Sequence, residues 1–354
     1  MLAIPTTKKI TIQLVTKEPY RGSGPRGIDL YARNLYEELS LVYPHDHYLV
    51  GPLAKGRAGV KLVHYTFFDP FFLTLHFKGP VKHCVVTVHD LIPLKFPAHF
   101  PAGLKGKFKW LIQKSCLRRV DAIITDSTCS ARDIHALVGF PQERIFVVPL
   151  AAPHTTITAD LARSVRKEYS LPERYILYVG DINWNKNVPS LIQAFATLND
   201  PELHLVLVGK AFVNGQGTPE LAAIKQAIAE SGRAERIHLL GFLPSHHLPA
   251  IYHLASLYVQ PSWYEGFGFP LLEAMLQDCP VLSSNQGSLP EVGNKFVHYF
   301  DPHNGSELAS QLKSLMSNDQ KRTSLTQDAK KWAKTFTWKK AATLTHAVYE
   351  KILE

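Results

Sequence analysis

Short runs of Val, Ile and Leu alternate with amphipathic helical stretches along the chain. The runs lie at residues 10–16, 60–65, 83–88, 121–125 and 145–149 in the first half, and at 175–180, 203–209, 236–240, 257–260, 280–283 and 296–300 in the second. Most runs are continuous and not alternating, which is typical of parallel strands covered on both faces. Stretches such as 30–39, 187–198 and 245–255 have helical periodicity, so the sequence predicts an α/β fold with parallel sheets.

The alternation breaks between residues 150 and 173, where turn-forming and small residues precede a short charged helix. A chain of 354 residues exceeds the size at which a single core keeps growing, so two domains are expected. We place the boundary in this break and predict two doubly wound, Rossmann-like domains, residues 1–160 and 165–337. Ligands of such domains bind at the carboxyl ends of the strands.

Composition is that of an ordinary globular protein, with 45% apolar and 19% charged residues. No apolar run reaches the ~20 residues that span a bilayer, and residues 1–15 resemble a first strand more than a signal peptide. The four cysteines (Cys84, Cys116, Cys129 and Cys279) have no paired spacing. We expect free thiols in a reducing compartment and no metal site built on them.

The formal charge of +9 is concentrated in the first half of the chain. Residues 1–160 hold 20 Lys and Arg against 12 Asp and Glu, a net of +8, and the remainder holds 19 against 18, a net of +1. A basic half indicates an acidic partner, which leaves nucleic acid, anionic lipid and a phosphorylated substrate open. Residues 104–119 form a basic helical segment with the aromatic Trp110. Such a segment favours either a membrane-surface helix or a solvated face of a core-packed helix.

The most informative segment is residues 264–274, Tyr-Glu-Gly-Phe-Gly-Phe-Pro-Leu-Leu-Glu-Ala, which follows the strand at 257–260. Pro270 suits the first position of a helix, and we expect the N–H groups of Leu271 and Leu272 to face a ligand above Gly266 and Gly268. Glu265 and Glu273 are hydroxyl acceptors on either side of that helix start. The pattern indicates a site for a sugar nucleotide.

Two further strand ends carry candidate chemistry. Lys186 lies in the turn after 175–180 and can neutralise a diphosphate, while Asn183, Asn185 and Asn187 are residues that tolerate positive φ and cap helices. His89 ends the run 83–88 beside Asp90. Residues 45–47, His-Asp-His, lie in a Pro-bounded turn, where we expect them to be solvated and not to bind a metal.

Glycines 22, 24 and 27 follow the first strand, but their spacing is not that of the dinucleotide fingerprint and no acidic ribose partner follows. Nicotinamide chemistry is therefore disfavoured.

Taken together, these motifs resemble the family 4 retaining glycosyltransferases of GT-B fold, over nearly the whole chain. The resemblance rests on six segments: Glu265 to Glu273, Tyr178-Val179-Gly180 with Lys186-Asn187, Leu207-Val208-Gly209, Leu240 to Pro244, Ser288 to Val292 and Thr87 to Leu91. It implies an N-terminal acceptor-binding domain, a C-terminal donor-binding domain, and a last helix at 338–354 that crosses back to the first domain.

The resemblance also implies roles for individual residues. The donor sugar would be held by Glu265 and by the backbone of Phe267 and Gly268. The ribose would be bound by Glu273. The diphosphate would be bound by Lys186 and by the N–H groups of Leu271 and Leu272. His89 would lie beside the transferred sugar, and the turn at Gly241-Phe242 would lie beside the base. Gly24 to Gly27 would lie near the phosphate. His89, Glu265 and Lys186 are thus the candidate catalytic residues, with no metal and no cofactor other than the sugar nucleotide as co-substrate.

Two departures from the family pattern concern phosphate binding. Members usually have an Arg between Gly180 and Lys186, where this chain offers Asp181 and Asn185, and many have Gly-x-Gly where it has Gly27-Ile28-Asp29. The segment from Gly180 to Asn187 resembles that of bacterial polysaccharide and O-antigen mannosyltransferases. This likeness implies GDP-mannose as the leading donor, with a UDP-sugar as the next candidate. It also implies an acceptor that is a glycan or is linked to polyprenyl diphosphate.

Other classes of protein remain open at this point. A nucleic-acid-binding protein would explain the basic half but not the Glu265 and Glu273 pair. A catalytically silent sugar-binding protein and a nucleotide-sugar epimerase share the same fold. We expect a cytoplasmic enzyme, peripheral on the inner face of the cell membrane if 104–119 binds lipid.

Overall fold

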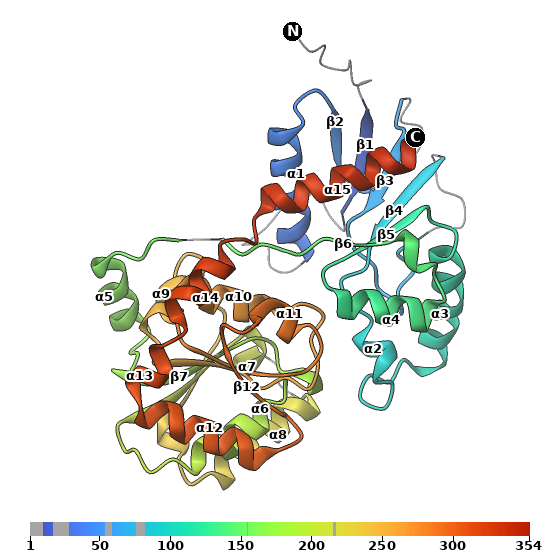
Figure 1. Cartoon of the computed structure of the whole chain (residues 1–354). Helices are drawn as coiled ribbons and strands as arrows, with labels where there is room; N and C mark the ends of the chain where they lie inside the picture. Colours follow the sequence, from blue (N-terminus) through green and yellow to red (C-terminus); the bar gives the residue numbers. More distant parts are fainter. Residues whose placement is uncertain (1–9, 17–27, 54–58, 76–81, 154, 215–216) are drawn as a thin grey trace. The chain divides into compact units, whose positions relative to one another are not determined.

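The chain forms two compact units in a computed structural model that describes residues 10–16, 28–53, 59–75, 82–153, 155–214 and 217–354 (Figure 1). The first unit comprises Met1–Leu150 and Thr337–Glu354, and the second comprises Ala151–Phe336. Each unit contains one six-stranded parallel sheet flanked by helices. The predicted α/β fold with two parallel, Rossmann-like sheets is confirmed.

The sheet of the first unit has the strand order β2-β1-β3-β4-β5-β6. Its strands are β1 (Thr11–Val15), β2 (His47–Gly51), β3 (Leu62–Tyr65), β4 (His83–Thr87), β5 (Ala122–Thr125) and β6 (Ile145–Val147). The helical elements are α1 (Ile28–Val42), α2 (Ile92–Lys95), α3 (Gly103–Leu117), α4 (Thr128–Val138), η1 (Gln142–Arg144) and α15 (Trp338–Leu353). Helix α15, the last of the chain, packs along α1 (Figure 1).

The sheet of the second unit has the order β12-β11-β10-β7-β8-β9. Its strands are β7 (Arg174–Val179), β8 (Leu203–Val208), β9 (Ile237–Leu240), β10 (Leu257–Gln260), β11 (Val281–Ser284) and β12 (His298–Phe300). The helical elements are α5 (Ala159–Glu168), η2 (Trp184–Lys186), α6 (Val188–Ala196), α7 (Lys210–Asn214), α8 (Pro219–Glu230), η3 (Ala234–Arg236), α9 (Leu248–Leu254), α10 (Phe269–Leu276), α11 (Leu289–Gly293), α12 (Gly305–Ser317), α13 (Asp319–Thr323) and α14 (Thr326–Ala333).

Burial explains why the strands read as continuous apolar runs. Every residue of β5 and β10 is buried, as are the last five of β7, so neither face of these central strands meets water. Helices cover both faces, as βαβ connections require. Among the described helices, none combines the length and the hydropathy that a bilayer crossing demands.

The His-Asp-His segment at 45–47 matches its expected solvated turn only in part: His45 and His47 are exposed, but Asp46 is half-buried. His47 begins β2, a strand that the apolar pattern did not reveal, because its inner positions are mixed. Asp46 accepts a hydrogen bond from the Ile10 N–H at 3.0 Å and pairs with His346 of α15 at 2.8 Å. Tyr43 stacks on the His346 ring at 3.6 Å between centroids. The prediction was wrong for Asp46 alone, because its partner lies 300 residues away along the chain.

Candidate functional site

The connectivity of the second sheet creates a switch point between β7 and β10. The chain passes from β7 through β8 to β9 on one side, then returns to place β10 on the other side of β7. Loops that leave two such strands diverge to opposite sides, which opens a crevice at the carboxyl edge, and this is where ligands of doubly wound sheets bind. Lys186 follows β7 and Glu265 follows β10. The topology therefore brings together two residues that the sequence singled out separately.

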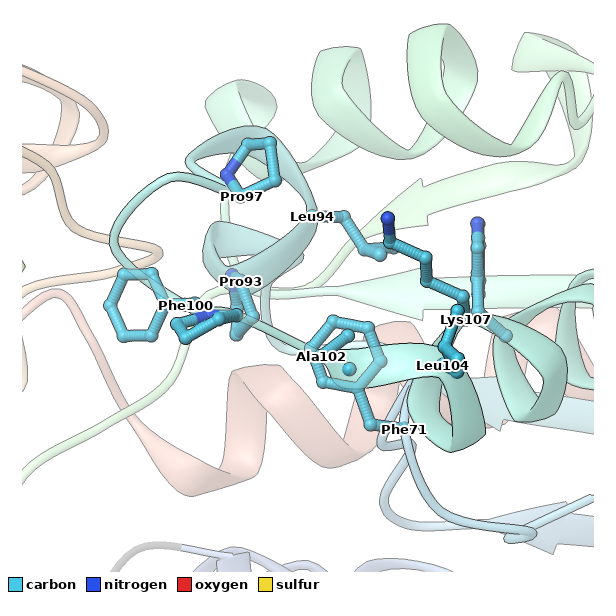
Figure 2. A pocket seen from close by; sticks show the side chains of 11 residues that line it. Phe71, Pro93, Leu94, Pro97, Phe100, Ala102, Leu104 and Lys107 are labelled. Atoms are coloured by element: carbon cyan, nitrogen blue, oxygen red, sulfur yellow. The ribbon is translucent and has the colours of Figure 1, made fainter.

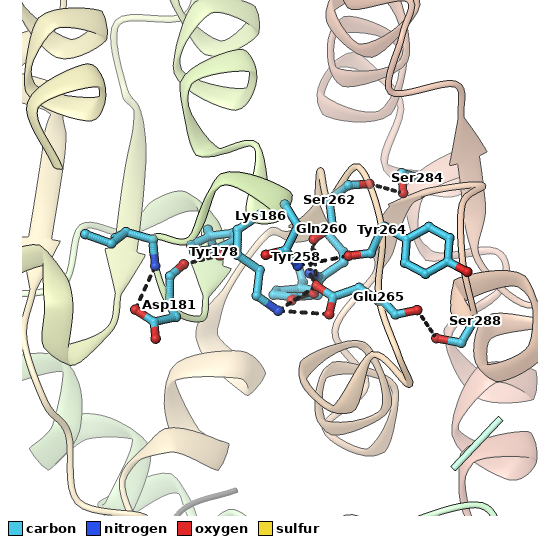
Figure 3. A network of polar contacts seen from close by, with 12 residues as sticks. Tyr178, Asp181, Lys186, Tyr258, Gln260, Ser262, Tyr264, Glu265, Ser284 and Ser288 are labelled. Atoms are coloured by element: carbon cyan, nitrogen blue, oxygen red, sulfur yellow. Dashed lines mark hydrogen bonds and ion pairs between the residues drawn. The ribbon is translucent and has the colours of Figure 1, made fainter. Parts of the chain in front are cut away.

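Lys186 and Glu265 form a close ion pair. The Lys186 Nζ lies 2.8 Å from both Glu265 carboxylate oxygens (Figure 3). Only 8% of the Glu265 side chain and 20% of the Lys186 side chain are exposed. Glu265 Oε1 also accepts hydrogen bonds from Gln260 Nε2 at 2.9 Å and Ser262 Oγ at 2.7 Å. A buried carboxylate needs such donors to offset its lost hydration, and all four side chains are therefore held in one network.

Further polar contacts connect the loops around this network. Gln260 also donates to Ser262 Oγ at 2.7 Å, and the hydroxyl of Ser284, the last residue of β11, donates to the Ser262 carbonyl at 2.6 Å (Figure 3). Ser288 donates through its hydroxyl to the Glu265 carbonyl at 3.0 Å. Gln260, Ser262 and Ser288 were not predicted as site residues. For Gln260 and Ser262 the only sequence signal was their place at or just after a strand's carboxyl end, whereas Ser288 begins one of the six segments that carry the family resemblance.

The asparagines after β7 act as cross-links and not as helix caps. Asn187 adopts the expected positive φ of 54°, but its side chain caps nothing at the start of α6. Its amide instead donates to the Pro261 carbonyl, and the Asn185 amide donates to the Tyr264 carbonyl, each at 3.0 Å. The Trp263 N–H donates back to the Asn185 carbonyl at 2.8 Å. The predicted capping was wrong, and these bonds hold the Lys186 loop against the Glu265 loop.

Helix α10 begins one residue before Pro270 and follows Gly268, whose φ of 94° strongly favours glycine. The N–H groups of Leu271 and Leu272 are not open to a ligand as predicted. Both donate to the Gly268 carbonyl, at 3.1 and 3.4 Å. In the described part of the chain, the N–H groups of Phe267, Gly268 and Phe269 find no hydrogen-bond acceptor. The backbone N–H groups available to an anion are therefore those of the glycine-rich turn and not those of Leu271 and Leu272.

Glu273 lies in the first turns of α10, partly buried, and its Oε2 accepts a hydrogen bond from Tyr252 of α9 at 3.0 Å. Gly241 and Phe242 follow β9 at the same sheet edge, and the Phe242 side chain is exposed. Gly209 follows β8 so close to Gly180 that a Cβ there would lie 2.0 Å from the Gly180 carbonyl oxygen. A side chain at 209 would push apart the strand ends that position Lys186.

The first unit carries the remaining candidate residues. His89 follows β4, and its Nδ1 lies 2.7 Å from Oδ2 of Asp126, which follows the adjacent strand β5. Burial opposes charge on the imidazole, but the Asp126 carboxylate and its hydrogen bond outweigh this and raise the pKa of His89. Asp126 was not predicted, although its place directly after a strand was a signal. Gly24 and Gly27 lie outside the described residues.

The first unit also has an apolar hollow of about 440 Å³ at the start of α3. Phe71, Pro93, Leu94, Phe100, Ala102 and Leu104 are among its lining residues (Figure 2). Lys107 also lines it, and Trp110 does so while packing partly buried against the core. The hollow lies between α2, the segment 97–102 and the first turns of α3, and none of the candidate catalytic residues lines it.

In the described segments, no group of three or more His, Cys, Asp or Glu side chains is arranged to hold a metal ion.

Comparison with known families gives two matches that together cover most of the chain. Residues 12–154 match the family described as Glycosyltransferase Family 4, and residues 163–332 match Glycosyl transferases group 1. O-antigen chain mannosyltransferase B of Escherichia coli is 30% identical over 293 residues, which are 81% of this chain and 74% of that protein. Serotype-specific mannosyltransferase WbdA of E. coli is 29% identical over 280 residues. That match takes in 76% of this chain but only 34% of WbdA, a longer protein.

Solved structures share the fold at low identity. Sucrose-phosphate synthase from Thermosynechococcus elongatus superposes with a TM-score of 0.77 at 18% identity, covering 97% of this chain and 99% of that one. Anabaena Alr3699/HepE in complex with UDP-glucose gives a TM-score of 0.72 at 18% identity, with 97% and 99% covered. At this level of identity the likeness concerns the architecture.

Proposed function

This chain belongs to the family 4 glycosyltransferases, a retaining family, and has the GT-B fold; we propose that it transfers mannose from GDP-mannose to a glycan or a polyprenyl-diphosphate-linked acceptor. The mannosyltransferase names of its E. coli relatives support mannose as the sugar. A UDP-sugar is the alternative donor, since a structural neighbour was solved with UDP-glucose. Polysaccharide or O-antigen-type synthesis is the corresponding process.

The observation that carries this proposal is the Lys186–Glu265 pair at the switch point, beside the turn at Gly268. A nucleoside diphosphate placed there would meet the Lys186 ammonium and the N–H groups of Gly268 and Phe269, all of which favour negative charge. Glu265 would accept hydroxyls of the sugar and Glu273 those of the ribose. Gly241 and Phe242 would border the base.

The chemistry follows from where charge develops. As the glycosyl bond breaks, the sugar becomes oxocarbenium-like and negative charge grows on the departing diphosphate. A preorganised cation and backbone N–H groups stabilise that charge more than they stabilise the ground state. We propose same-face attack by the acceptor hydroxyl, with the leaving phosphate taking its proton. No metal is needed in this scheme, because Lys186 and the N–H groups supply the positive charge.

Ligand-dependent stability tests the donor site first. A ligand that binds only the folded state, present at 100 times its Kd, adds about 2.7 kcal/mol to the stability. We expect GDP to raise the melting temperature more than UDP or ADP, with and without a chelator. A larger shift with UDP would move the donor to the UDP-sugars, and a shift that requires Mg²⁺ would contradict the metal-free scheme.

Transfer itself requires a separate assay, because a silent sugar-binding protein would also be stabilised by GDP. Radiolabelled GDP-mannose should yield labelled glycan when the purified enzyme is mixed with a lipid-extracted acceptor fraction. Slow release of free mannose without acceptor would also show a competent site. Binding with neither transfer nor hydrolysis would mean that the protein is not an enzyme.

We also propose a peripheral location on an anionic, cytoplasmic membrane face, supported by the surface of α3. Leu104, Phe108 and Leu111 follow helical spacing on one face and are between 65% and 86% exposed. Lysines 105, 107, 109 and 114 lie among them, and α3 contains no acidic residue. Trp110, the aromatic residue of this segment, is partly buried and lines the hollow described above. The exposed apolar residues would therefore serve as the anchor.

Vesicle sedimentation tests this location. Each Lys near an anionic surface contributes about 1 kcal/mol and is screened by salt. Binding should therefore increase with phosphatidylglycerol content, fall with salt, and decrease when lysines 105, 107 and 109 are changed to Glu. Phe108→Ser should weaken it without altering the salt dependence. Equal partitioning onto neutral and anionic vesicles, or onto neither, would contradict the proposal.

A further inference from the structure

The His89–Asp126 pair is built more firmly than a chance surface contact. Asp126 directly follows β5 and His89 follows the neighbouring strand β4 after one residue, so the ladder between β4 and β5 holds their backbones. The Val88 N–H donates to the Ile124 carbonyl at 2.9 Å, which extends that ladder up to His89. Only 4% of the Asp126 side chain and 19% of the His89 side chain are exposed.

The bond to Asp126 determines which imidazole nitrogen is left for a ligand. A carboxylate accepts, so Nδ1 must carry a proton and Nε2 points to the opposite side of the ring. The Nε2 atom is buried and forms no hydrogen bond of normal geometry with any described residue, although the Thr66 backbone is close enough to raise the pKa of His89; Asp126 Oδ1 likewise has no partner among the described residues. Buried polar nitrogens without a partner are rare in folded proteins and indicate an absent ligand or water.

A second set of contacts keeps the ring from turning. Tyr31 of α1 meets the imidazole edge-to-face at 4.8 Å between centroids. The Tyr31 hydroxyl is bonded to Thr87 Oγ1 at 2.9 Å, and Thr87 in turn to His64 Nε2 at 2.7 Å. His64 Nδ1 then meets the Tyr349 hydroxyl of α15 at 2.6 Å. The orientation of His89 is thus supported by three strands and two helices.

We propose that Asp126 is a positioning residue for glycosyl transfer: it holds His89 with Nδ1 protonated, so that the Nε2–H donates a hydrogen bond to an oxygen of a substrate at the carboxyl edge of the first unit's sheet. This inference rests on the proposed transferase function and assigns to it a residue and a protonation state. The recipient oxygen belongs to a sugar hydroxyl or to a phosphate, both of which accept hydrogen bonds.

The electrostatic surroundings favour the donor form of His89. Burial lowers the pKa of His89, but Asp126 on the loop after β5, Asp90 beside it and the backbone of Thr66 after β3 together raise this pKa above its ordinary value. His64, the neighbouring titratable group on β3, stays neutral because burial lowers its pKa to about 3. The raised pKa of His89 means that its charge is present at low pH and lost as the pH rises through that value.

Nuclear magnetic resonance tests the protonation state without requiring any catalysis. Imidazole ¹⁵N spectra of the full chain, with the His89 signals assigned by their absence in His89→Gln, should show a His89 that stays doubly protonated above pH 6.5. In Asp126→Asn this titration should move at least one pH unit lower. A His89 that titrates at or below its ordinary value in the wild-type protein, or a titration that is unmoved by Asp126→Asn, would overturn the proposal.

Kinetics then test the role in transfer. We expect Asp126→Asn to lower kcat/KM at least tenfold at pH 7.5 and to shift the alkaline fall of the pH profile toward lower pH. Asp133→Asn is the matched control: Asp133 is also buried in this unit, but it pairs with Lys95 at 2.6 Å and not with His89. It should lower the melting temperature but leave the position of the pH profile unchanged.

The possible failures are distinguishable. If Asp126→Asn does not fold, Asp126→Glu keeps the carboxylate and should retain part of the activity with the His89 titration still raised. A profile shifted equally by Asp133→Asn would show a merely structural effect and refute the role of Asp126. If no donor supports transfer at all, the transferase proposal fails, while the NMR result still decides the state of the His89–Asp126 pair.

Discussion

Replacing Lys186 tests whether its positive charge binds the donor or only neutralises Glu265. In Lys186→Ala, the Glu265 carboxylate stays buried and keeps the hydrogen bonds from Gln260 and Ser262 but loses its cation. In the double variant Lys186→Ala/Glu265→Gln, that unpaired charge is removed as well. The two variants therefore separate the stability of the pair from the affinity for a diphosphate.

The expected magnitudes follow from the geometry. Removing one partner of a buried ion pair costs about 3–5 kcal/mol, and the two remaining donors should reduce this to about 2–3 kcal/mol in Lys186→Ala. The double variant should regain all but about 1 kcal/mol, because a neutral amide can accept the same two bonds. Diphosphate affinity should fall by about 1.5–3 kcal/mol, roughly 10- to 150-fold, in both variants.

Thermal unfolding of the ligand-free proteins and calorimetric titration with GDP supply the two readouts. Lys210→Ala is a suitable control, because this exposed lysine follows β8 at the same sheet edge and should change GDP affinity by less than about 0.5 kcal/mol. If the double variant regains GDP affinity together with stability, Lys186 acts only by holding the loops. Unchanged affinity in Lys186→Ala would remove it from the donor site altogether.

Three further changes probe other parts of the structure. Glu273→Ala should weaken GDP binding by about 1–2 kcal/mol in calorimetry, whereas Glu265→Ala should mainly lower kcat; unchanged affinity in a folded Glu273→Ala would contradict this. Burial lowers the pKa of His64 to about 3, so as the pH falls below about 6.5 the unfolded state gains a proton that the folded state does not. The free energy of unfolding of the wild type, measured by denaturant titration, should therefore be about 2 kcal/mol lower at pH 5 than at pH 7. His64→Gln should not show this decrease. Gly268→Ala should lower both stability and GDP affinity, because a Cβ would meet Leu289 at 2.6 Å and φ is 94°; a fully stable variant in thermal unfolding would refute this.

The sequence was sufficient to predict the parallel sheets because their signal is local. A run such as 203–209 is buried on both faces, so apolar side chains are required at nearly every position, and the run is visible without any knowledge of its neighbours. Strand β2 lacks that signal, since it lies at the sheet edge next to β1 alone and only Tyr48 and Gly51 are buried. Edge strands need fewer apolar residues, and their pairing depends on distant contacts.

The candidate site was predictable in its members but not in their contacts. Lys186 and Glu265 each stood out at a strand end, yet their pairing joins residues 79 positions apart and follows only from the sheet order. The backbone donors were misplaced for a similar reason. The positive φ of Gly268 turns its carbonyl toward the N–H groups of Leu271 and Leu272, a local geometry that no apolar or charge pattern reports.

The pairing of Lys186 with Glu265 also bears on the missing arginine. Asp181, one of the residues in its place, directs Oδ1 to the Ile182 N–H of its own loop at 2.9 Å and offers no positive charge. In the ligand-free protein the Lys186 charge is already matched by Glu265, so a diphosphate alone must compete for it. A donor sugar whose hydroxyls donate to Glu265 would compensate that carboxylate and release Lys186 toward the phosphates. Sugar and diphosphate binding are then coupled through this pair, and the proposed site favours the intact donor over the nucleotide product.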